Sequence, residues 1–237
     1  MLSLVITMAG EGSRFREAGY ASPKPRIQVK GKTLREWALD SLDSLATPGC
    51  RVVFVDRVGR SDAAELRSLV ARWRPGRVDL VELPSSTDGQ ATTTLHGLET
   101  AGVTGPFVVY NIDTHIRPGS LRPPDQEWDG WIPCFEAPGD HWSFVQATRD
   151  GVVERVAEKS RISNWASVGL YGFRSPAMFR EAYTETYAHD AQITERYIAP
   201  IYNWMVDQGM TVRMTCIPFA DVVPLGTPQE VERFAAS

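Results

Sequence analysis

The stretch "VITMAGEGSRFREAGYASPKPRIQV" (residues 5–29) places an apolar run directly before a glycine-rich turn and a rigid basic segment. Residues 2–8 form a short apolar run that ends close to a glycine, which predicts a buried strand. Gly10 and Gly12 would let the backbone approach a ligand, and successive N–H groups in such a turn can point at an anion. Open parallel sheets bind ligands at the carboxyl ends of their strands. We therefore expect a binding loop at this sheet edge.

Two basic side chains follow the turn. Arg14 comes directly after it, and Lys24 lies between Pro23 and Pro25, which fix the backbone dihedral φ and stiffen the segment. A guanidinium and an ammonium on a rigid backbone suit a polyphosphate. The stretch matches neither a P-loop nor a dinucleotide-binding fingerprint, whose lysine or third glycine is missing at the required spacing. A purely structural turn with solvated cations is the alternative interpretation.

The hydrophobic periodicity alternates between strand and helix in the first half of the chain. We expect strands at 51–56, 78–83 and 106–113 and helices at 31–45, 61–73 and 91–101, the first opened by a Thr33–Glu36 capping box. This alternation predicts stacked βαβ units around a parallel sheet. The second half predicts a hairpin that turns at Asp150-Gly151, strands at 165–175 and 210–219, and helices at 193–209, bent at Pro200, and 227–236.

The bulk properties restrict the class of protein. The chain has 237 residues and a net charge of -4, and we expect one domain covering residues 1–237 that binds no nucleic acid. Its three cysteines form no CxxC pair, so we expect neither a disulfide framework nor a zinc site. No apolar run approaches the ~18 residues that a membrane span requires. A cytoplasmic enzyme or binding protein without a membrane partner is the natural expectation.

The pattern G-x-G-S-R-F…G-Y…P-K-P-x-I-x-V-x-G-K-x-L resembles the N-terminal signature of the nucleotidyltransferase superfamily, whose members include sugar-phosphate nucleotidyltransferases and cytidylyltransferases. Further segments that match in the family's order lie at 87–93, 111–116, 158–173 and 225–234. The resemblance implies an α/β fold of the GT-A type. This is a Rossmann-like three-layer α/β/α arrangement with a mostly parallel central sheet and a smaller mixed β portion. The nucleotide-binding half would cover about 1–115, and the acceptor-binding half about 116–237.

The resemblance also implies a reaction in which a nucleoside triphosphate (NTP) is joined to a phosphate monoester and pyrophosphate is released. With a sugar phosphate as acceptor, the product is an NDP-sugar for glycan or specialised-metabolite synthesis. Arg14, on the leaving phosphates, and Lys24, between the attacking and attacked phosphates, would be catalytic. The residues that would hold the nucleotide are Ala9, Gly10, Glu11, Gly12, Ser13 and Arg14, with Gly89 and Gln90 at the base edge.

Asp113 is the candidate metal ligand, because it ends an apolar strand at the edge that faces the loop and Mg²⁺ prefers carboxylate and phosphate oxygens. Family members hold Mg²⁺ (or Mn²⁺) with such an aspartate. They usually carry a second aspartate two residues before the late Gly-Thr-Pro, where this chain has Pro224. Three explanations are open: Asp113 and the phosphates suffice, another acid such as Asp221 or Glu195 serves, or the chain has lost activity.

The acceptor site is expected around Glu158-Lys159, which matches the family's Glu-Lys pair. Lys159 would contact the acceptor phosphate, Glu158 would orient the acceptor or the lysine, and Asn164 and Gly169 would lie against the same ligand. An aromatic cluster either packs the smaller sheet or forms a wall beside a sugar ring or a quaternary ammonium; it comprises Trp128, Trp131, Phe135, Trp142 and Phe144.

Three alternatives to a sugar-phosphate enzyme are kept. The first is a cytidylyltransferase for an amino-alcohol phosphate or a phosphonate, which Pro224 and the aromatic cluster motivate. The second is a glycosyltransferase, which would release a nucleoside diphosphate and would not need Arg14 and Lys24. The third is a nucleotide-binding regulatory paralogue without turnover. The sequence leaves open the base, the acceptor and the oligomeric state, a homo-oligomer included.

Overall fold

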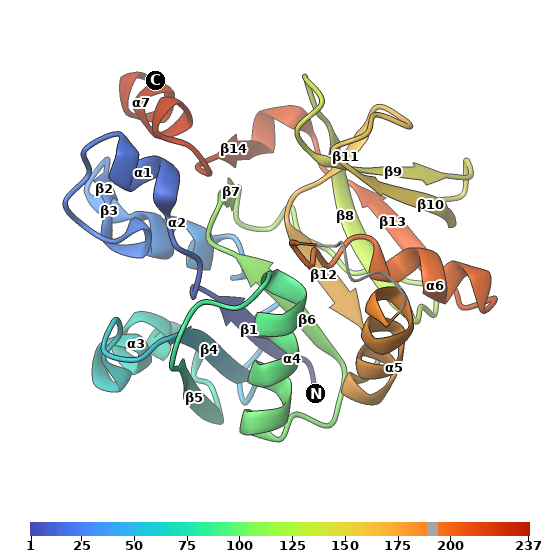
Figure 1. Cartoon of the computed structure of the whole chain (residues 1–237), viewed down its shortest axis with the longest axis horizontal. Coiled ribbons are helices and arrows are strands. Elements are labelled where there is room, and N and C mark those ends of the chain that lie inside the picture. The colour runs from blue at the N-terminus through green and yellow to red at the C-terminus, as the bar shows by residue number, and fades with distance from the viewer. Residues whose placement is uncertain (189–193) are drawn as a thin grey trace.

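The computed structural model describes residues 1–188 and 194–237. Within them, one ten-stranded sheet runs through both halves of the chain (Figure 1). Its strand order is β10-β9-β11-β8-β12-β6-β1-β4-β5, with β13 paired to β8. In that order the strands are β10 (Val153–Glu158), β9 (Ser143–Ala147), β11 (Trp165–Ser167), β8 (Gly130–Glu136), β12 (Leu170–Phe173), β6 (Phe107–Asn111), β1 (Ser3–Thr7), β4 (Arg51–Arg57), β5 (Arg77–Leu83) and β13 (Val212–Cys216).

The first half of the chain forms the parallel part of the sheet. Strands β6, β1, β4 and β5 are parallel neighbours, and Leu4 on β1 lies between Val108 and Val52. Strand β12 pairs antiparallel with β6 and joins this part to the mixed part built from the second half. The Rossmann-like α/β prediction with a mostly parallel sheet and a mixed β portion is confirmed.

Helices cover both faces of the parallel part and make three layers (Figure 1). Leu4 and Ile6 pack on the face covered by α2 (Leu34–Asp40) and α3 (Ala63–Val70). Val5 points to the opposite face, which α4 (Gln90–Ala101), α5 (Pro176–Tyr187) and α6 (Ile201–Asp207) cover. Residues that alternate along β1 therefore pack into two separate cores, which explains why Leu4, Val5 and Ile6 are all apolar.

A third, smaller core joins the start of the chain to its end. Phe15, Ile27, Leu225 and Val231 are among its buried members. They come from the segment containing α1 (Ser13–Glu17), the 3₁₀ turn η1 (Lys24–Arg26), β2 (Gln28–Val29) and β3 (Lys32–Thr33), and from β14 (Val222–Pro224) and α7 (Pro228–Ala236). Strand β14 pairs with β7 (Thr114–Ile116). The last helix thus supports the basic N-terminal segment from behind, as the adjacent blue and red ribbons of Figure 1 show.

Three element predictions were wrong in detail. The helix expected at 193–209 begins only at Ile201; residues 194–200 are not helical, and residue 193 lies outside the described residues. The strand expected at 165–175 is interrupted at Val168-Gly169, where the glycine has a φ of +82°. The helix expected at 31–45 ends at Asp40, although its Thr33–Glu36 capping box is confirmed. Helix α5 was not predicted, despite Ser175 as N-cap and Pro176 at its first position.

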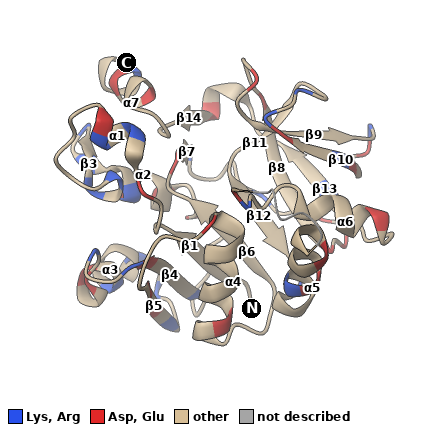
Figure 2. Ribbon diagram, viewed as in Figure 1, with Lys and Arg blue, Asp and Glu red and all other residues tan. Residues whose placement is uncertain are grey.

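Charged residues are concentrated away from the central strands. Strands β1, β6 and β12 carry no charged residue, and Figure 2 shows acidic and basic residues distributed over the surrounding helices, edge strands and loops. No helix in the described part of the chain has the length and apolar character needed to cross a bilayer.

Candidate active site

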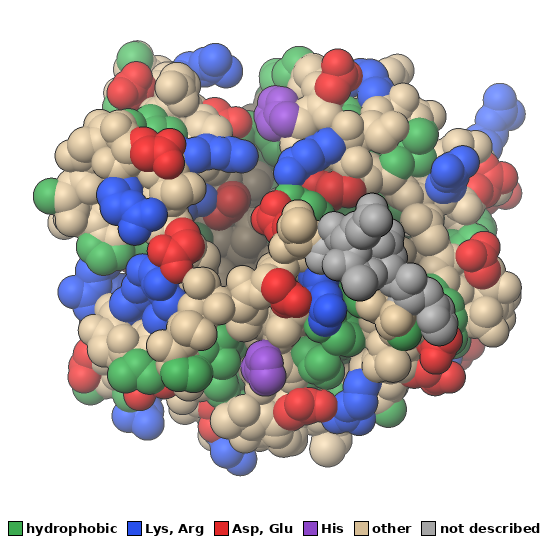
Figure 3. Space-filling view, in the orientation of Figure 1, with side chains coloured by type: hydrophobic (Ala, Val, Ile, Leu, Met, Phe, Trp, Pro, Cys, Tyr) green, Lys and Arg blue, Asp and Glu red, His purple; other side chains and the backbone are tan. Residues whose placement is uncertain are grey.

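A deep cleft of about 760 Å³ opens where β1 and β6 end at Thr7 and Asn111. Figure 3 shows the hollow near the centre of the face, with acidic side chains inside it and basic side chains on both rims. The cleft lies at the carboxyl ends of parallel strands, where α/β sheets bind ligands. All but one of the predicted site residues line it: Ala9, Gly10, Glu11, Gly12, Ser13, Arg14, Lys24, Gly89, Gln90, Asp113, Glu158, Lys159 and Gly169.

The glycine-rich loop is held in place from behind by β4 and the residues after it. Arg57 Nη1 lies 2.6 Å from Glu11 Oε1, and Arg60 Nη1 donates to the carbonyl oxygen of Gly10 at 3.0 Å. A hydrogen bond from Ser86 lowers the pKa of Glu11, and the charge of Arg57 adds to the effect. The side chain of Glu11 is therefore engaged with the scaffold, which leaves the loop backbone to contact a ligand.

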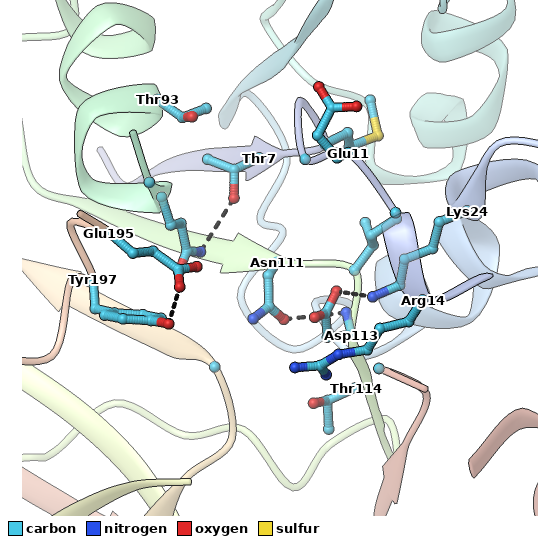
Figure 4. Close-up of a pocket in the computed structure, with 18 of the residues that line it drawn as sticks. Thr7, Glu11, Arg14, Lys24, Thr93, Asn111, Asp113, Thr114, Glu195 and Tyr197 are labelled. Atoms are coloured by element: carbon cyan, nitrogen blue, oxygen red, sulfur yellow. Dashed lines mark hydrogen bonds and ion pairs between the residues drawn. The ribbon is translucent and has the colours of Figure 1, made fainter. Parts of the chain in front are cut away.

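Lys24 and Asp113 form an ion pair in the cleft (Figure 4). The lysine side chain is only 13% exposed, and its ammonium also lies 5.5 Å from the centre of the Phe15 ring. Asp113 is fixed at both ends of its backbone: its N–H donates to Asn111 Oδ1 at 3.1 Å, and its carbonyl accepts from the Leu225 N–H at 2.6 Å. Two residues 89 positions apart thus meet at the place where phosphates and a cation are expected.

Arg14 completes the basic side of the cleft. It lies on α1, is exposed, and extends into the cleft from the same side as Lys24, close to Asp113 (Figure 4). Glu195 and Tyr197 lie on the opposite side, with Asn111 and Asp113 between the two groups. A ligand that spans the cleft would therefore meet cations at one end and a mixed polar and aromatic surface at the other.

Gly89 and Gln90 form the turn that opens α4. Gly89 has a φ of +150°, and a Cβ there would lie 2.3 Å from the carbonyl oxygen of Arg196, so this close approach requires glycine. Gln90 donates through Nε2 to Thr7 Oγ1 at 3.1 Å. The pair presents a backbone turn and a side-chain amide to the cleft, which are suitable groups for reading the edge of a planar base.

Glu158 and Lys159 lie at the end of β10. Burial raises the pKa of Glu158, whose carboxylate accepts a hydrogen bond from Ser143. Lys159 has a left-handed backbone with a φ of +52°. Gly169 has a φ of +82°, and a Cβ there would lie 2.7 Å from Asn111 Nδ2. The glycine therefore brings the backbone between β11 and β12 directly against Asn111, the residue that orients Asp113.

Asn164 is the predicted site residue that the structure does not bring to the cleft. It is exposed and lines a separate shallow hollow with Arg161 and Phe219, and its side-chain oxygen accepts from Arg161 Nη2 at 3.2 Å. Asn164 precedes β11, whereas the cleft is lined by Ser167 and Gly169 farther along the chain. This position does not suit the expected role in acceptor binding.

The two acids considered as a second metal ligand, Asp221 and Glu195, are both engaged with other residues. Pro224 lines the cleft opposite Thr114, and its side chain offers no ligand. Asp221 does not line the cleft and pairs with Arg117 at 3.0 Å. Glu195 lines the cleft but accepts a hydrogen bond from Tyr197. No cluster of three or more candidate ligands (His, Cys, Asp, Glu) occurs within residues 1–188 and 194–237.

The aromatic cluster of the second half serves mainly the core. Trp131, Phe135 and Phe144 are at most 1% exposed, so the packing interpretation holds for them. Trp142 is the member that lines the cleft. The polar cleft residues that sequence reasoning missed include Thr7, Asn111 and Tyr197. A polar residue at the end of an apolar strand was an available signal for Thr7 and Asn111, whereas no periodicity marks Tyr197.

The solved structure of the nucleoside-diphosphate-sugar pyrophosphorylase from Vibrio cholerae RC9 is similar to this chain over its entire length. The two share 33% sequence identity with a TM-score of 0.88, and the match covers 99% of this chain and 100% of the other. The chain belongs to the nucleotidyltransferase superfamily. Its enzyme class is therefore that of nucleotide transfer to an acceptor, as the opening signature implied.

A second solved structure shares the fold of this nucleotidyltransferase. The inositol-1-phosphate CTP transferase from T. maritima is 16% identical with a TM-score of 0.77, and the match covers 99% of this chain and 94% of the other. No protein-family model and no curated protein matches the sequence significantly. The assignment to the superfamily thus depends on the Vibrio cholerae protein.

Proposed function

We propose that this nucleotidyltransferase joins an NTP to a sugar phosphate, releases pyrophosphate and yields an NDP-sugar for glycan or specialised-metabolite synthesis. The observation that carries the proposal is the meeting of Lys24, Arg14 and Asp113 in one cleft with Lys159. Lys24 and Arg14 together can hold a triphosphate, and Lys159 can hold the phosphate of an acceptor. The name of the Vibrio cholerae relative supports the choice of a sugar phosphate.

The reaction is an in-line displacement at phosphorus. An oxygen of the acceptor phosphate forms a bond to the α-phosphorus, and the bond from that phosphorus to the bridging oxygen of the β-phosphate breaks. The enzyme contributes positioning and neutralisation of charge. We assign Lys24 to the attacking and attacked phosphates, Arg14 to the leaving β- and γ-phosphates, Gln90 to the base, and residues 9–13 to the phosphate chain through their backbone.

The residues around Asp113 fit a divalent cation of the Mg²⁺ or Mn²⁺ type. The Asp113 side chain is 45% exposed to the cleft and supplies hard oxygens, and Mg²⁺ is commonly bound by one or two carboxylates together with substrate phosphates. When bound, the cation would neutralise phosphate charge. Because Pro224 offers no second side-chain ligand, we propose that Asp113 and the phosphates suffice. Lys24 then shifts from Asp113 to the phosphates.

A second candidate is a cytidylyltransferase that acts on an amine-bearing acceptor, such as an amino-alcohol phosphate. The acceptor end of the cleft holds two carboxylates, Glu158 and Glu195, together with Trp142 and Tyr197. Carboxylates and aromatic faces both attract an ammonium group. A glycosyltransferase is less favoured, because such an enzyme would not need the Lys24–Arg14 cradle. We propose that the protein is located in the cytoplasm, where its NTP substrate is found.

The test is a screen of the purified protein for pyrophosphate release. ATP, CTP, GTP, UTP and dTTP are each combined with hexose 1-phosphates, hexosamine 1-phosphates, phosphoethanolamine and phosphocholine in the presence of Mg²⁺. The proposal expects turnover with a sugar phosphate and one preferred base. Turnover with only the amino-alcohol phosphates supports the second candidate. NTP binding without turnover of any acceptor supports the regulatory paralogue and contradicts the proposal.

A further inference from the structure

Lys159 is held in an unusual conformation by two independent contacts. Its backbone lies in the left-handed region at a φ of +52°, which is strained for a residue with a side chain, and its N–H donates to the carbonyl of Trp142 at 2.9 Å. Its ammonium donates to the hydroxyl of Tyr197, and the same ammonium lies 4.6 Å from the centre of the Tyr197 ring. Backbone and side chain are thus both fixed before any acceptor binds.

The Tyr197 hydroxyl has a fixed direction as well. It donates its proton to Glu195, so its oxygen lone pairs are directed to the Lys159 ammonium. Burial raises the pKa of Tyr197, so the hydroxyl keeps its proton at neutral pH. Figure 4 shows Tyr197 and Glu195 side by side on the wall opposite Arg14. The order Glu195–Tyr197–Lys159 forms a directional chain of hydrogen bonds.

The segment that carries Tyr197 is anchored on the nucleotide side of the cleft. The Arg196 N–H donates to the carbonyl of Asp88 at 2.7 Å, and the Arg196 carbonyl accepts from the Ala91 N–H at 3.0 Å. Arg196 Nε also lies 3.1 Å from Asp88 Oδ2, and Tyr187 donates its hydroxyl proton to the carbonyl of Tyr197. Tyr197 is therefore placed by the start of α4 and by α5, independently of β10, which directly precedes Lys159.

We propose that Tyr197 is a positioning residue that aims the Lys159 ammonium at the phosphate of the acceptor, with Glu195 orienting the Tyr197 hydroxyl. The inference rests on the proposed function, in which Lys159 contacts that phosphate. An ammonium has three donors, so one can stay on Tyr197 while the others bind the acceptor. A long, flexible lysine loses affinity when it must be ordered during binding, and the tyrosine removes that cost beforehand.

The test is steady-state kinetics of Tyr197→Phe with the NTP and the acceptor that the wild type uses best in the pyrophosphate screen. We expect the KM for the acceptor to rise about 3- to 10-fold, because the Lys159 side chain must then be ordered during binding. The KM for the NTP and the melting temperature should change little, because the ring is retained. In a Lys159→Met background, Tyr197→Phe should add less than about twofold, since the positioned group is already absent.

Tyr183→Phe is the matched control. Tyr183 lies on α5, and its hydroxyl accepts a hydrogen bond from Nη1 of Arg196, the neighbour of Tyr197 in the chain. The substitution removes this hydroxyl and leaves the Glu195–Tyr197–Lys159 chain intact. Its acceptor KM should stay at the wild-type value. The inference is overturned if Tyr197→Phe leaves the acceptor KM unchanged, or raises both KM values equally as a loosened segment would. If the wild type turns over no acceptor, the proposed function is wrong and this inference falls with it. That outcome is recognised from the wild type alone, before any variant is compared.

Discussion

Asn111 orients Asp113 through a hydrogen bond to its backbone N–H, and Asn111 is itself packed against Gly169. Because a Cβ at residue 169 would lie 2.7 Å from Asn111 Nδ2 and the backbone there has a φ of +82°, Gly169→Ala both strains the backbone and displaces the amide. We predict a loss of about 1–3 kcal/mol in the free energy of unfolding and a lower turnover, measured by urea unfolding and by pyrophosphate release.

Gly19→Ala is the control for this change. Gly19 has a φ of +84°, and no atom lies within 4 Å of where its Cβ would be. It reports the cost of the backbone conformation alone and should leave turnover intact. A Gly169→Ala variant with the stability and turnover of Gly19→Ala would show that the contact with Asn111 does not matter.

His115 predicts a pH dependence of stability. Burial lowers its pKa, opposed by a contact of Nδ1 with the carbonyl of Trp37 at 2.9 Å and by the charge of Asp40, while Lys32 adds to the lowering. The unfolded chain then binds a proton at a higher pH than the folded chain. Stability is complete above the ordinary pKa of ~6.5 and is lost as the pH falls below it, by at most about 1.4 kcal/mol per pH unit.

Urea unfolding at pH 7.5, 6.5 and 5.5 measures this loss. The exposed His96 supplies the control, because His96→Gln should keep the dependence whereas His115→Gln should reduce its slope between pH 6.5 and 5.5. Equal slopes in the wild type and His115→Gln would show that the burial of His115 has no effect on proton uptake.

Glu65 on α3 links the turn η1, which carries Lys24, to helix α2. Glu65 Oε1 lies 2.5 Å from Nη2 of Arg35 on α2, and Oε2 lies 3.1 Å from Nη2 of Arg26 in η1. The Arg35 side chain is 2% exposed, and its Nε and Nη1 have no partner among the described residues. Glu65 therefore neutralises this guanidinium by direct ion pairing, while the buried Asp56 interacts with its charge without an ion pair.

Glu65→Gln removes that neutralisation. We predict a loss of about 1–3 kcal/mol in the free energy of unfolding, less than for a fully buried pair because Glu65 is partly exposed. Thermal and urea unfolding measure the loss. Glu99→Gln breaks an exposed pair with Arg180 and should cost under about 1 kcal/mol. Equal losses in the two variants would contradict a special role for Arg35.

Elements that obey local rules could be predicted from the sequence, and those set by distant contacts could not. The capping box of α2 and the Asp150-Gly151 hairpin depend on neighbours in the chain, and both were found. Residues 194–200 carry a helical pattern, but the backbone N–H and carbonyl of Arg196 bond instead to Asp88 and Ala91, on either side of the turn at Gly89. The expected strand at 165–175 breaks at Gly169 because the chain must pass close to Asn111.

The contrast between local rules and distant contacts also explains which residues of the cleft could be predicted from the sequence. Arg14 and Lys24 could be predicted because they share one stretch with the glycine-rich loop, and Asp113 because it ends an apolar strand. Tyr197 could not, because its proposed role arises from a contact with Lys159, which lies far from it in the sequence. Asn164 was predicted as part of the segment at 158–173 that resembles the family, and the fold places it in another hollow.

The cation proposal makes a prediction for the molecule as a whole. Asp113→Asn keeps the size of the side chain and removes its charge, so NTP affinity should lose most of its dependence on Mg²⁺ concentration. Calorimetric titration of the preferred NTP at several Mg²⁺ concentrations measures this. Asp221→Asn, outside the cleft, should titrate as the wild type does. An unchanged Mg²⁺ dependence in Asp113→Asn would remove this residue from the cation site.

The central claim is that one cleft joins the phosphates of two substrates across Lys24. The initial rate of pyrophosphate release, compared between the wild type and Lys24→Ala, tests it most directly. We predict a loss of about 10²–10³-fold, because Lys24 stabilises transferring charge, whereas loss of its pair with the half-exposed Asp113 should lower the melting temperature only slightly. Lys32→Ala, which breaks a surface pair with Asp40, should retain the wild-type rate. A Lys24→Ala rate within twofold of the wild type would contradict the account.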